Sequence, residues 1–217
     1  MNPIVVINPN STQAVTDVMD RALDPLRLSG GPPVECVTLR EGPPGIETQK
    51  HVDAVVVPIC NLIKKLESDV SAFVIGCFSD PAVTEARLIT SKPVLGIAES
   101  SMLVAMTRGF KFGVVSILEN SVVRHRSYVH ELGFAARFAG DRPVGLNVTE
   151  LVRHDQAFER LVEVGRELKD IDDADVLITG CAGMSGYRVA LEKSVGLPVI
   201  DPVQAAVSLA ISQIILS

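Results

Sequence analysis

The sequence predicts an α/β fold with two pseudo-symmetric domains, each a four-stranded parallel sheet flanked by helices. Short runs rich in Val and Ile alternate with longer helical patterns along all 217 residues, as in successive βα units. Trp is absent and aromatic residues make up only 4% of the chain, so the core must consist of Val, Ile, Leu and Ala. Such a core is typical of buried parallel strands.

The third observation is an internal repeat. Residues 70–101 and 173–206 both contain a strand, a Gly-Cys pair, a turn, a helix, and then Pro-Val followed by an acidic residue that begins another helix. A Gly-Cys pair thus ends the third strand of each half, which indicates a duplication. A (βα)₈ barrel has the same number of elements and is the alternative fold, but 217 residues is small for it.

The expected elements follow in chain order. We expect strands at 4–8, 34–39, 72–76, 93–97, 111–116, 134–138, 176–179 and 197–200. We expect helices at 12–24, 47–68, 81–90, 99–107, 120–132, 149–169, 185–194 and 202–216. The chain should cross to its second half near Ala98, and the last helix should return to the first half. The predicted domains are therefore 1–98 plus 205–217, and 99–204.

Composition excludes several classes of protein. The net charge is −6 and no block of like charge exists, so no nucleic-acid partner is expected. The uncharged stretch 202–217 is too short to span a bilayer, so no membrane partner is expected either. The first residues are typical of a strand and not of a signal peptide, which favours a cytoplasmic protein with reduced cysteines.

Cys77 and Cys181 are the candidate catalytic residues. Both follow the carboxyl end of a strand, where parallel sheets bind ligands, and the repeat would let them approach one ligand from opposite sides. We expect Asp80 and Ser185 to cap the helices that follow, and the positive helix ends to lower the pKa of both thiols.

The remaining cysteines and the histidines are interpreted as structural. Cys36 and Cys60 lie in apolar stretches and are expected to be small buried side chains. No Cys-x-x-Cys motif or close Cys/His set exists, so no metal site is predicted. The four histidines, at 51, 125, 130 and 154, are interpreted as surface or core residues.

Two thiols on opposite faces of a ligand suit racemisation. One thiolate removes an acidic C–H proton, and the opposite thiol delivers a proton to the other face. The enolate intermediate needs hydrogen-bond donors, which we expect from backbone N–H groups at 79–80 and 183–184 and from the Ser79 hydroxyl.

Four motifs carry a family resemblance: VINPNST at 6–12, GCFSDP at 76–81, GCAGM at 180–184 and PVIDPVQAA at 198–206. With these motifs in order, the chain resembles the hydantoin/allantoin racemase branch of the aspartate/glutamate racemase superfamily. The resemblance implies a two-domain α/β fold, a small-molecule site between the domains, no cofactor and a homo-oligomer. It also implies that Cys77 and Cys181 are the catalytic pair.

The resemblance extends to the substrate site. Asn8, after the first strand, matches a polar position that is Asp in glutamate racemases, and an amide there suits a neutral ring with an acidic C–H. The expected substrate is therefore a 5-monosubstituted hydantoin or allantoin. The predicted substrate-binding residues are Asn8, Ile46, Phe78, Ser79, Asp80, Ser116, Gly183 and Met184.

Alternative functions remain at this point. A cis-trans isomerase of a small dicarboxylate, similar to maleate isomerase, would also keep both cysteines, whereas an arylmalonate decarboxylase would keep one. Gly180-x-x-Gly183-x-x-Gly186 resembles a phosphate-binding turn, but its register differs from the dinucleotide motif. A nucleotide or small-molecule binding module on the same scaffold is the other alternative. Glu99 and Asp201 are expected to be helix caps or hinge residues.

Overall fold

The computed structural model describes residues 1–151 and 157–216, which form two separate four-stranded sheets. The strand order is β2-β1-β3-β4 in the first sheet and β6-β5-β7-β8 in the second, and all pairings are parallel. When the four strands of each half are numbered along the chain, both sheets have the order 2-1-3-4. The two-sheet α/β prediction is confirmed, and the barrel alternative is wrong because each sheet is open at both edges.

The first half contains β1 (Ile4–Asn8), α1 (Gln13–Ala22), η1 (Asp24–Leu26), β2 (Val34–Thr38), α2 (Gln49–Leu66), η2 (Glu67–Asp69), β3 (Ala72–Ile75), α3 (Val83–Arg87) and β4 (Val94–Gly96). The chain continues with α4 (Ile97–Ala105), β5 (Phe112–Ser116), α5 (Glu119–Glu131), η3 (Ala135–Arg137), β6 (Phe138–Pro143), α6 (Val148–Leu151), α7 (Ala157–Asp170), β7 (Val176–Thr179), η4 (Ala182–Met184), α8 (Arg188–Val195), β8 (Val199–Ile200) and α9 (Pro202–Leu216).

Alternating side chains of each central strand pack on opposite faces of the sheet. In β1, Ile4 and Val6 belong to the cluster that contains α1 and α9, whereas Val5 and Ile7 pack with α2. All five residues of this strand are buried. Helices therefore cover both faces of the sheet, as its uninterrupted apolar strands require.

The sixth strand differs from its prediction. It spans Phe138–Pro143 and not 134–138, because residues 135–137 form the 3₁₀ turn η3. As an edge strand it is mostly half-buried, and only Asp141 within it is fully buried. The apolar pattern that locates central strands is therefore missing here.

Three predicted helices are shorter or divided. The helix expected at 81–90 is only the five-residue α3, because Asp80 and Ala82 have left-handed backbone with φ of 44° and 65°. The helix expected at 149–169 corresponds to α6 and α7, and its residues 152–156, with His154, lie outside the described residues. The helix expected at 185–194 begins at Arg188, so Ser185 does not cap it.

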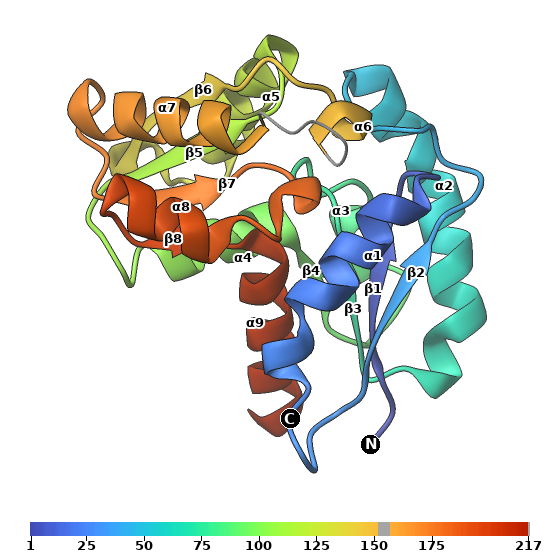
Figure 1. Cartoon of the computed structure of the whole chain (residues 1–217). Helices are drawn as coiled ribbons and strands as arrows, with labels where there is room; N and C mark the ends of the chain where they lie inside the picture. Colours follow the sequence, from blue (N-terminus) through green and yellow to red (C-terminus); the bar gives the residue numbers. More distant parts are fainter. Residues whose placement is uncertain (152–156, 217) are drawn as a thin grey trace.

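Two helices connect the halves. The last helix, α9, packs against β1, β3 and β4 of the first sheet, while α4 contacts β7 and β8 of the second (Figure 1). These contacts agree with a chain crossing near Ala98 and a return of the last helix. The boundaries 1–98 plus 205–217 and 99–204 stay predictions, and Ser217 lies outside the described residues. Within those residues, no helix has the length and apolarity needed to cross a membrane.

Candidate active site between the two sheets

Cys77 and Cys181 occupy equivalent places at the carboxyl ends of the third strands. Each follows a glycine whose N–H continues the sheet: Gly76 donates to Ile7 O and Gly180 to Val115 O, both at 2.8 Å. A Cβ at Gly76 would lie 3.0 Å from Ile7 O, and one at Gly180 would lie 2.8 Å from Val115 O. The glycines therefore let each strand end pass close to its neighbour before the cysteine.

Both cysteines line one small cavity of about 30 Å³ between the halves. That volume is about the room for one water molecule. Its lining from the first half comprises Asn10, Val15, Ile46, Gly76, Cys77, Phe78 and Ser79. The second half contributes Ile117, Ser121, Arg124, His125, Val148, Cys181 and Ala182. Two thiols from symmetry-equivalent positions thus face the same space.

The backbone around the two cysteines is also equivalent. The N–H of Gly183 donates to Cys181 Sγ at 3.4 Å, and the backbone of Ser79 correspondingly lowers the pKa of Cys77. The N–H groups of Asp80 and Met184 donate to the carbonyl oxygens of Cys77 and Cys181. The N–H groups of Asp80, Gly183 and Met184 are therefore occupied by the cysteines themselves, and the expectation that they bind an enolate is not supported by their geometry.

The expected lowering of the thiol pKa is wrong. Burial raises the pKa of Cys77 to about 12 and that of Cys181 to about 11. The N–H groups of Ser79 and Gly183 act in the opposite direction, but burial outweighs them. The physical reason is that the helices following the two cysteines are short: α3 has only five residues and η4 is a single 3₁₀ turn, so neither adds a strong positive helix end.

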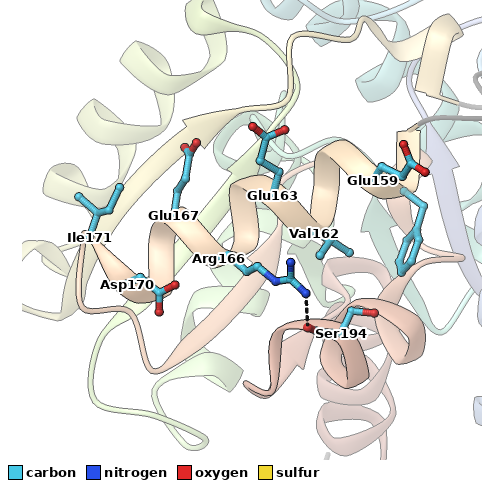
Figure 2. Close-up of a pocket in the computed structure, with 9 residues that line it drawn as sticks. Glu159, Val162, Glu163, Arg166, Glu167, Asp170, Ile171 and Ser194 are labelled. Atoms are coloured by element: carbon cyan, nitrogen blue, oxygen red, sulfur yellow. Dashed lines mark hydrogen bonds between the residues drawn. The ribbon is translucent and has the colours of Figure 1, made fainter.

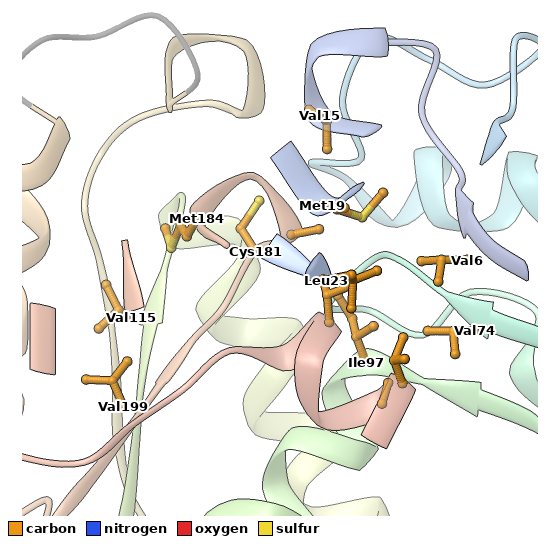
Figure 3. Packing of buried hydrophobic residues seen from close by; sticks show 14 of the residues in the cluster. Val6, Val15, Met19, Leu23, Val74, Ile97, Val115, Cys181, Met184 and Val199 are labelled. Carbon is orange, nitrogen blue, oxygen red and sulfur yellow. The ribbon is translucent and has the colours of Figure 1, made fainter. Parts of the chain in front are cut away.

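Apolar neighbours explain much of the effect at Cys181. Figure 3 shows Cys181 near Met184 of its own half and near Val15 and Met19 of α1, and all four belong to one buried cluster. This cluster joins the two halves beside the cavity. A thiolate there would lose hydration without gaining a partner other than the Gly183 N–H.

Ile46, Phe78 and Ser79 lie in the cavity wall as predicted, but Asn8 does not. Its side-chain amide donates to Asn10 Oδ1, Thr12 O and Thr16 Oγ1, and its Oδ1 accepts from the N–H of Asn10. Asn8 is fully buried and satisfied inside the first half. Asn10, two residues later, is the amide that reaches the cavity.

Asp80 also points away from the cavity. Its two carboxylate oxygens accept from the N–H groups of Ala98 and Glu99, at 2.9 and 2.8 Å, and Tyr128 donates its hydroxyl to Oδ2. Asp80 therefore caps α4 and not the helix that follows it in sequence. Its own helix begins only at Val83.

The described cavity lining does not include three of the predicted substrate-binding residues: Ser116, Gly183 and Met184. The Ser116 hydroxyl lies 3.0 Å from Nδ1 of His125, and Met184 is buried in the apolar cluster. Asp201 caps α9 through Val203 N and Gln204 N, at 2.9 Å each, which confirms the predicted cap.

The sequence interpretation missed three wall residues on α5: Ser121, Arg124 and His125. Their i, i+3, i+4 spacing puts them on one helix face, at the start of the helix that follows β5. That combination, a polar face on the first turns after a central strand, was the signal available in the sequence. His125 is buried, and its Nδ1 lies 2.8 Å from Asp141 Oδ2 on the edge strand β6.

A wider hollow of about 370 Å³ adjoins the cavity between α2 and α5. The two share Phe78, Ser79, Arg124 and His125. The rest of the hollow is lined by Gln49, Val52, Val123, Ser127, Tyr128 and Glu131. A ligand larger than water therefore has room next to the thiols.

A second hollow, along α7, is less suited to chemistry. Figure 2 shows it with Glu159, Glu163, Glu167 and Asp170 along the helix, and with Arg166 bonded to the carbonyl of Ser194 at 3.4 Å. None of the described residues that line it is a cysteine or histidine. Within residues 1–151 and 157–216, no three His, Cys, Asp or Glu side chains come together as a metal ion would need.

Comparisons with known proteins agree with this geometry. The family model for Asp/Glu/hydantoin racemases matches residues 4–210. A hydantoin racemase from Pseudomonas sp. (strain NS671) is 35% identical over 209 residues, which cover 95% of this chain and 84% of that protein.

Solved structures agree as well. Allantoin racemase from Klebsiella pneumoniae superposes with a TM-score of 0.93 at 30% identity, covering 100% of this chain and 89% of that one. Allantoin racemase from Pseudomonas fluorescens superposes with a TM-score of 0.92 at 25% identity, covering 99% of this chain and 91% of that one.

Proposed function

This chain belongs to the Asp/Glu/hydantoin racemase family, in its hydantoin/allantoin racemase branch, and is a racemase; we propose that it inverts the stereocentre of a hydantoin-type ring by proton transfer between Cys77 and Cys181. The substrate is a 5-monosubstituted hydantoin or allantoin. The observation that carries the proposal is that thiols from equivalent strand ends line one cavity.

The reaction needs one thiolate and one thiol at its start. The thiolate takes the proton from the ring carbon between the carbonyl and the N–H, which leaves an enolate. The opposite thiol then gives its proton to the other face of that carbon and becomes the thiolate. The product is the mirror image, the two cysteines have exchanged roles, and no oxidant or cofactor enters the balance.

The cavity favours a ring over a dicarboxylate. Two carboxylates would each need a cationic partner, whereas the described lining contains one arginine and one histidine, and the Nδ1 of that histidine, His125, is already bonded to Asp141. The amide of Asn8 cannot select a ring substrate as expected, because its N–H groups are already bonded within the first half. The ring needs more room than about 30 Å³, and the adjoining hollow between α2 and α5 supplies it.

The experiment is polarimetry of the purified protein with enantiopure allantoin and with a 5-alkylhydantoin, in D₂O and without added cofactor. Loss of optical rotation together with deuterium at the stereocentre is the expected result. Unchanged rotation and no deuterium uptake with both rings would contradict the proposed substrate class.

Single substitutions test the two-base step. Cys77→Ser and Cys181→Ser should each lower racemisation by about 10²–10⁴-fold, because serine is a far weaker base at neutral pH. Either variant can retain proton exchange with one enantiomer. Cys60→Ser is the matched control, since Cys60 lies on α2 outside the cavity lining. Wild-type rates in both active-site variants would refute the mechanism.

We also propose that the protein works in the cytoplasm as a homo-oligomer, on the strength of the family resemblance. Light scattering after size-exclusion chromatography measures the mass directly against the 23.2 kDa of one chain. A mass equal to one chain would contradict the oligomer.

A further inference from the structure

Arg124 reaches across the cleft from the second half to the first. It lies on α5, and its Nη1 donates to the carbonyl of Glu47 in the first half at 2.9 Å. The same nitrogen donates to Asn120 O at 2.9 Å, and Nη2 donates to Ser121 Oγ at 3.3 Å. All three acceptors are uncharged, so the guanidinium is held in place without a counter-ion from them.

The guanidinium is poised for an anion. Among the described residues, no carboxylate forms an ion pair with Arg124, and its buried Nε has no hydrogen-bond partner. The side chain lines both the cavity that holds the thiols and the wider hollow beside it. Burying a cation without a counter-ion costs free energy unless the cation stabilises a nearby negative charge. The thiol of Cys77 can supply that charge when it loses its proton.

We propose that Arg124 is the cation that stabilises the negative charge formed in this cavity, on the sulfur of Cys77 and then on the enolate oxygen of the substrate. The enolate part rests on the proposed racemase chemistry, whereas the thiolate part does not. The backbone N–H groups of Gly183, Asp80 and Met184 already donate to the two cysteines. Arg124 is therefore the strongest donor in the wall that is left for a substrate oxygen.

The charges around Cys77 agree with this role. Burial raises the pKa of Cys77 most, and Cys181 and Asp80 raise it further, whereas the Ser79 backbone and Arg124 lower it. In return, Cys77 raises the pKa of Arg124, which burial lowers. His125 also lines the cavity, and Glu47 raises the pKa of the opposite thiol, Cys181. Arg124 is thus the one cation that acts on Cys77 among these groups.

The test compares Arg124→Lys with Arg124→Met. The two side chains have similar length and both lack the planar guanidinium fork, but only lysine keeps a positive charge and N–H donors. The readout is the rate at which iodoacetamide alkylates Cys77 at pH 8.5, followed by mass spectrometry of its peptide. Arg126→Met is the matched control, because Arg126 is exposed on the same helix.

We expect Cys77 to be alkylated about tenfold faster in Arg124→Lys than in Arg124→Met, the change that one pKa unit produces. The Cys60 rate should be equal in all variants, and Arg126→Met should match the wild type. Equal Cys77 rates in the Lys and Met variants, with both folded by circular dichroism, would overturn the proposal. Alkylation involves no turnover, so this outcome is independent of whether either ring proves to be the substrate.

The enolate part is tested with whichever ring the polarimetry identifies. The value of kcat/KM should fall about a hundredfold in Arg124→Met and recover in part in Arg124→Lys. A fall of equal size in both variants would assign Arg124 to cleft closure through Glu47 and would refute charge stabilisation of the enolate.

Discussion

Replacing Asp80 with alanine should remove a loss of unfolding free energy that the wild-type protein shows between pH 5 and pH 7. The Asp80 carboxylate is buried and caps α4, where it accepts from the N–H groups of Ala98 and Glu99. Burial raises its pKa from 3.8 to about 7 despite these two bonds. The wild-type protein therefore holds a proton on Asp80 that the unfolded chain has already released.

The sign and size of the effect follow from this difference. A folded pKa above the unfolded value adds stability below about pH 4, and that stability is lost as pH rises towards 7. The loss is about 1.4 kcal/mol per pH unit and slows as the pH reaches the folded pKa, which gives about 2 kcal/mol between pH 5 and pH 7. Asp80→Ala removes this dependence and leaves two buried N–H groups unpaired, at a cost of about 1–3 kcal/mol each.

Urea denaturation followed by circular dichroism at pH 5 and pH 7 measures this directly. The gap in unfolding free energy between the wild type and Asp80→Ala should be about 2 kcal/mol larger at pH 5. Asp201, whose pKa is raised to about 6 by burial, contributes equally to both proteins and cancels in the comparison.

The control is Asp173→Ala. Asp173 is exposed and also has left-handed backbone, with φ of 58°, so its substitution reports backbone strain without a buried carboxylate. A gap for Asp80→Ala that is the same at pH 5 and pH 7 would refute the reasoning.

Two further predictions concern the site and its loop. Because burial raises the pKa of Cys77 to about 12 and that of Cys181 to about 11, alkylation of both should rise about tenfold per pH unit from pH 7 to pH 10; a plateau below pH 9, seen in peptide-resolved kinetics, would contradict the dominance of burial. Gly42→Ala should lower the unfolding free energy by about 2 kcal/mol, because the new Cβ would lie 2.1 Å from Pro9 O. Relief of this clash requires the loop that carries Ile46 into the cavity to move, so racemisation should also fall. Gly186→Ala is the control, since nothing lies within 4 Å of its Cβ, and equal melting temperatures and rates for the two variants would show that the loop tolerates the shift.

Periodicity predicted the central strands well and the edge strand β6 badly. The bounds of β1 and β7 match their predictions, because strands with helices on both faces are apolar throughout. The edge strand β6 carries Asp141 and Arg142 and is half-buried, so its sequence contains no such run. Similarly, α3 was predicted too long, because left-handed backbone at Asp80 and Ala82 cannot be deduced from helix-forming residues alone.

The residues of the candidate site were also predicted in part. Cys77, Cys181, Ile46, Phe78 and Ser79 were found in the sequence and do line the cavity. Asn8 and Asp80 lie within the family motifs at 6–12 and 76–81, but their side chains bond to other groups inside the protein and not to the cavity. Which of two nearby polar side chains faces a cavity depends on partners far along the chain, such as Ala98 for Asp80.

The duplicated α/β architecture and the cysteine pair could be predicted from the residues alone, because both depend on local pattern and on its repetition. The electrostatics of the site, in contrast, arise from packing. Burial of both thiols raises their pKa, and Arg124 acts on Cys77 from the other half, where its Nη1 donates to the carbonyl of Glu47 across the cleft. Burial and cross-cleft contacts are properties of the packed chain, and no local stretch of residues specifies them.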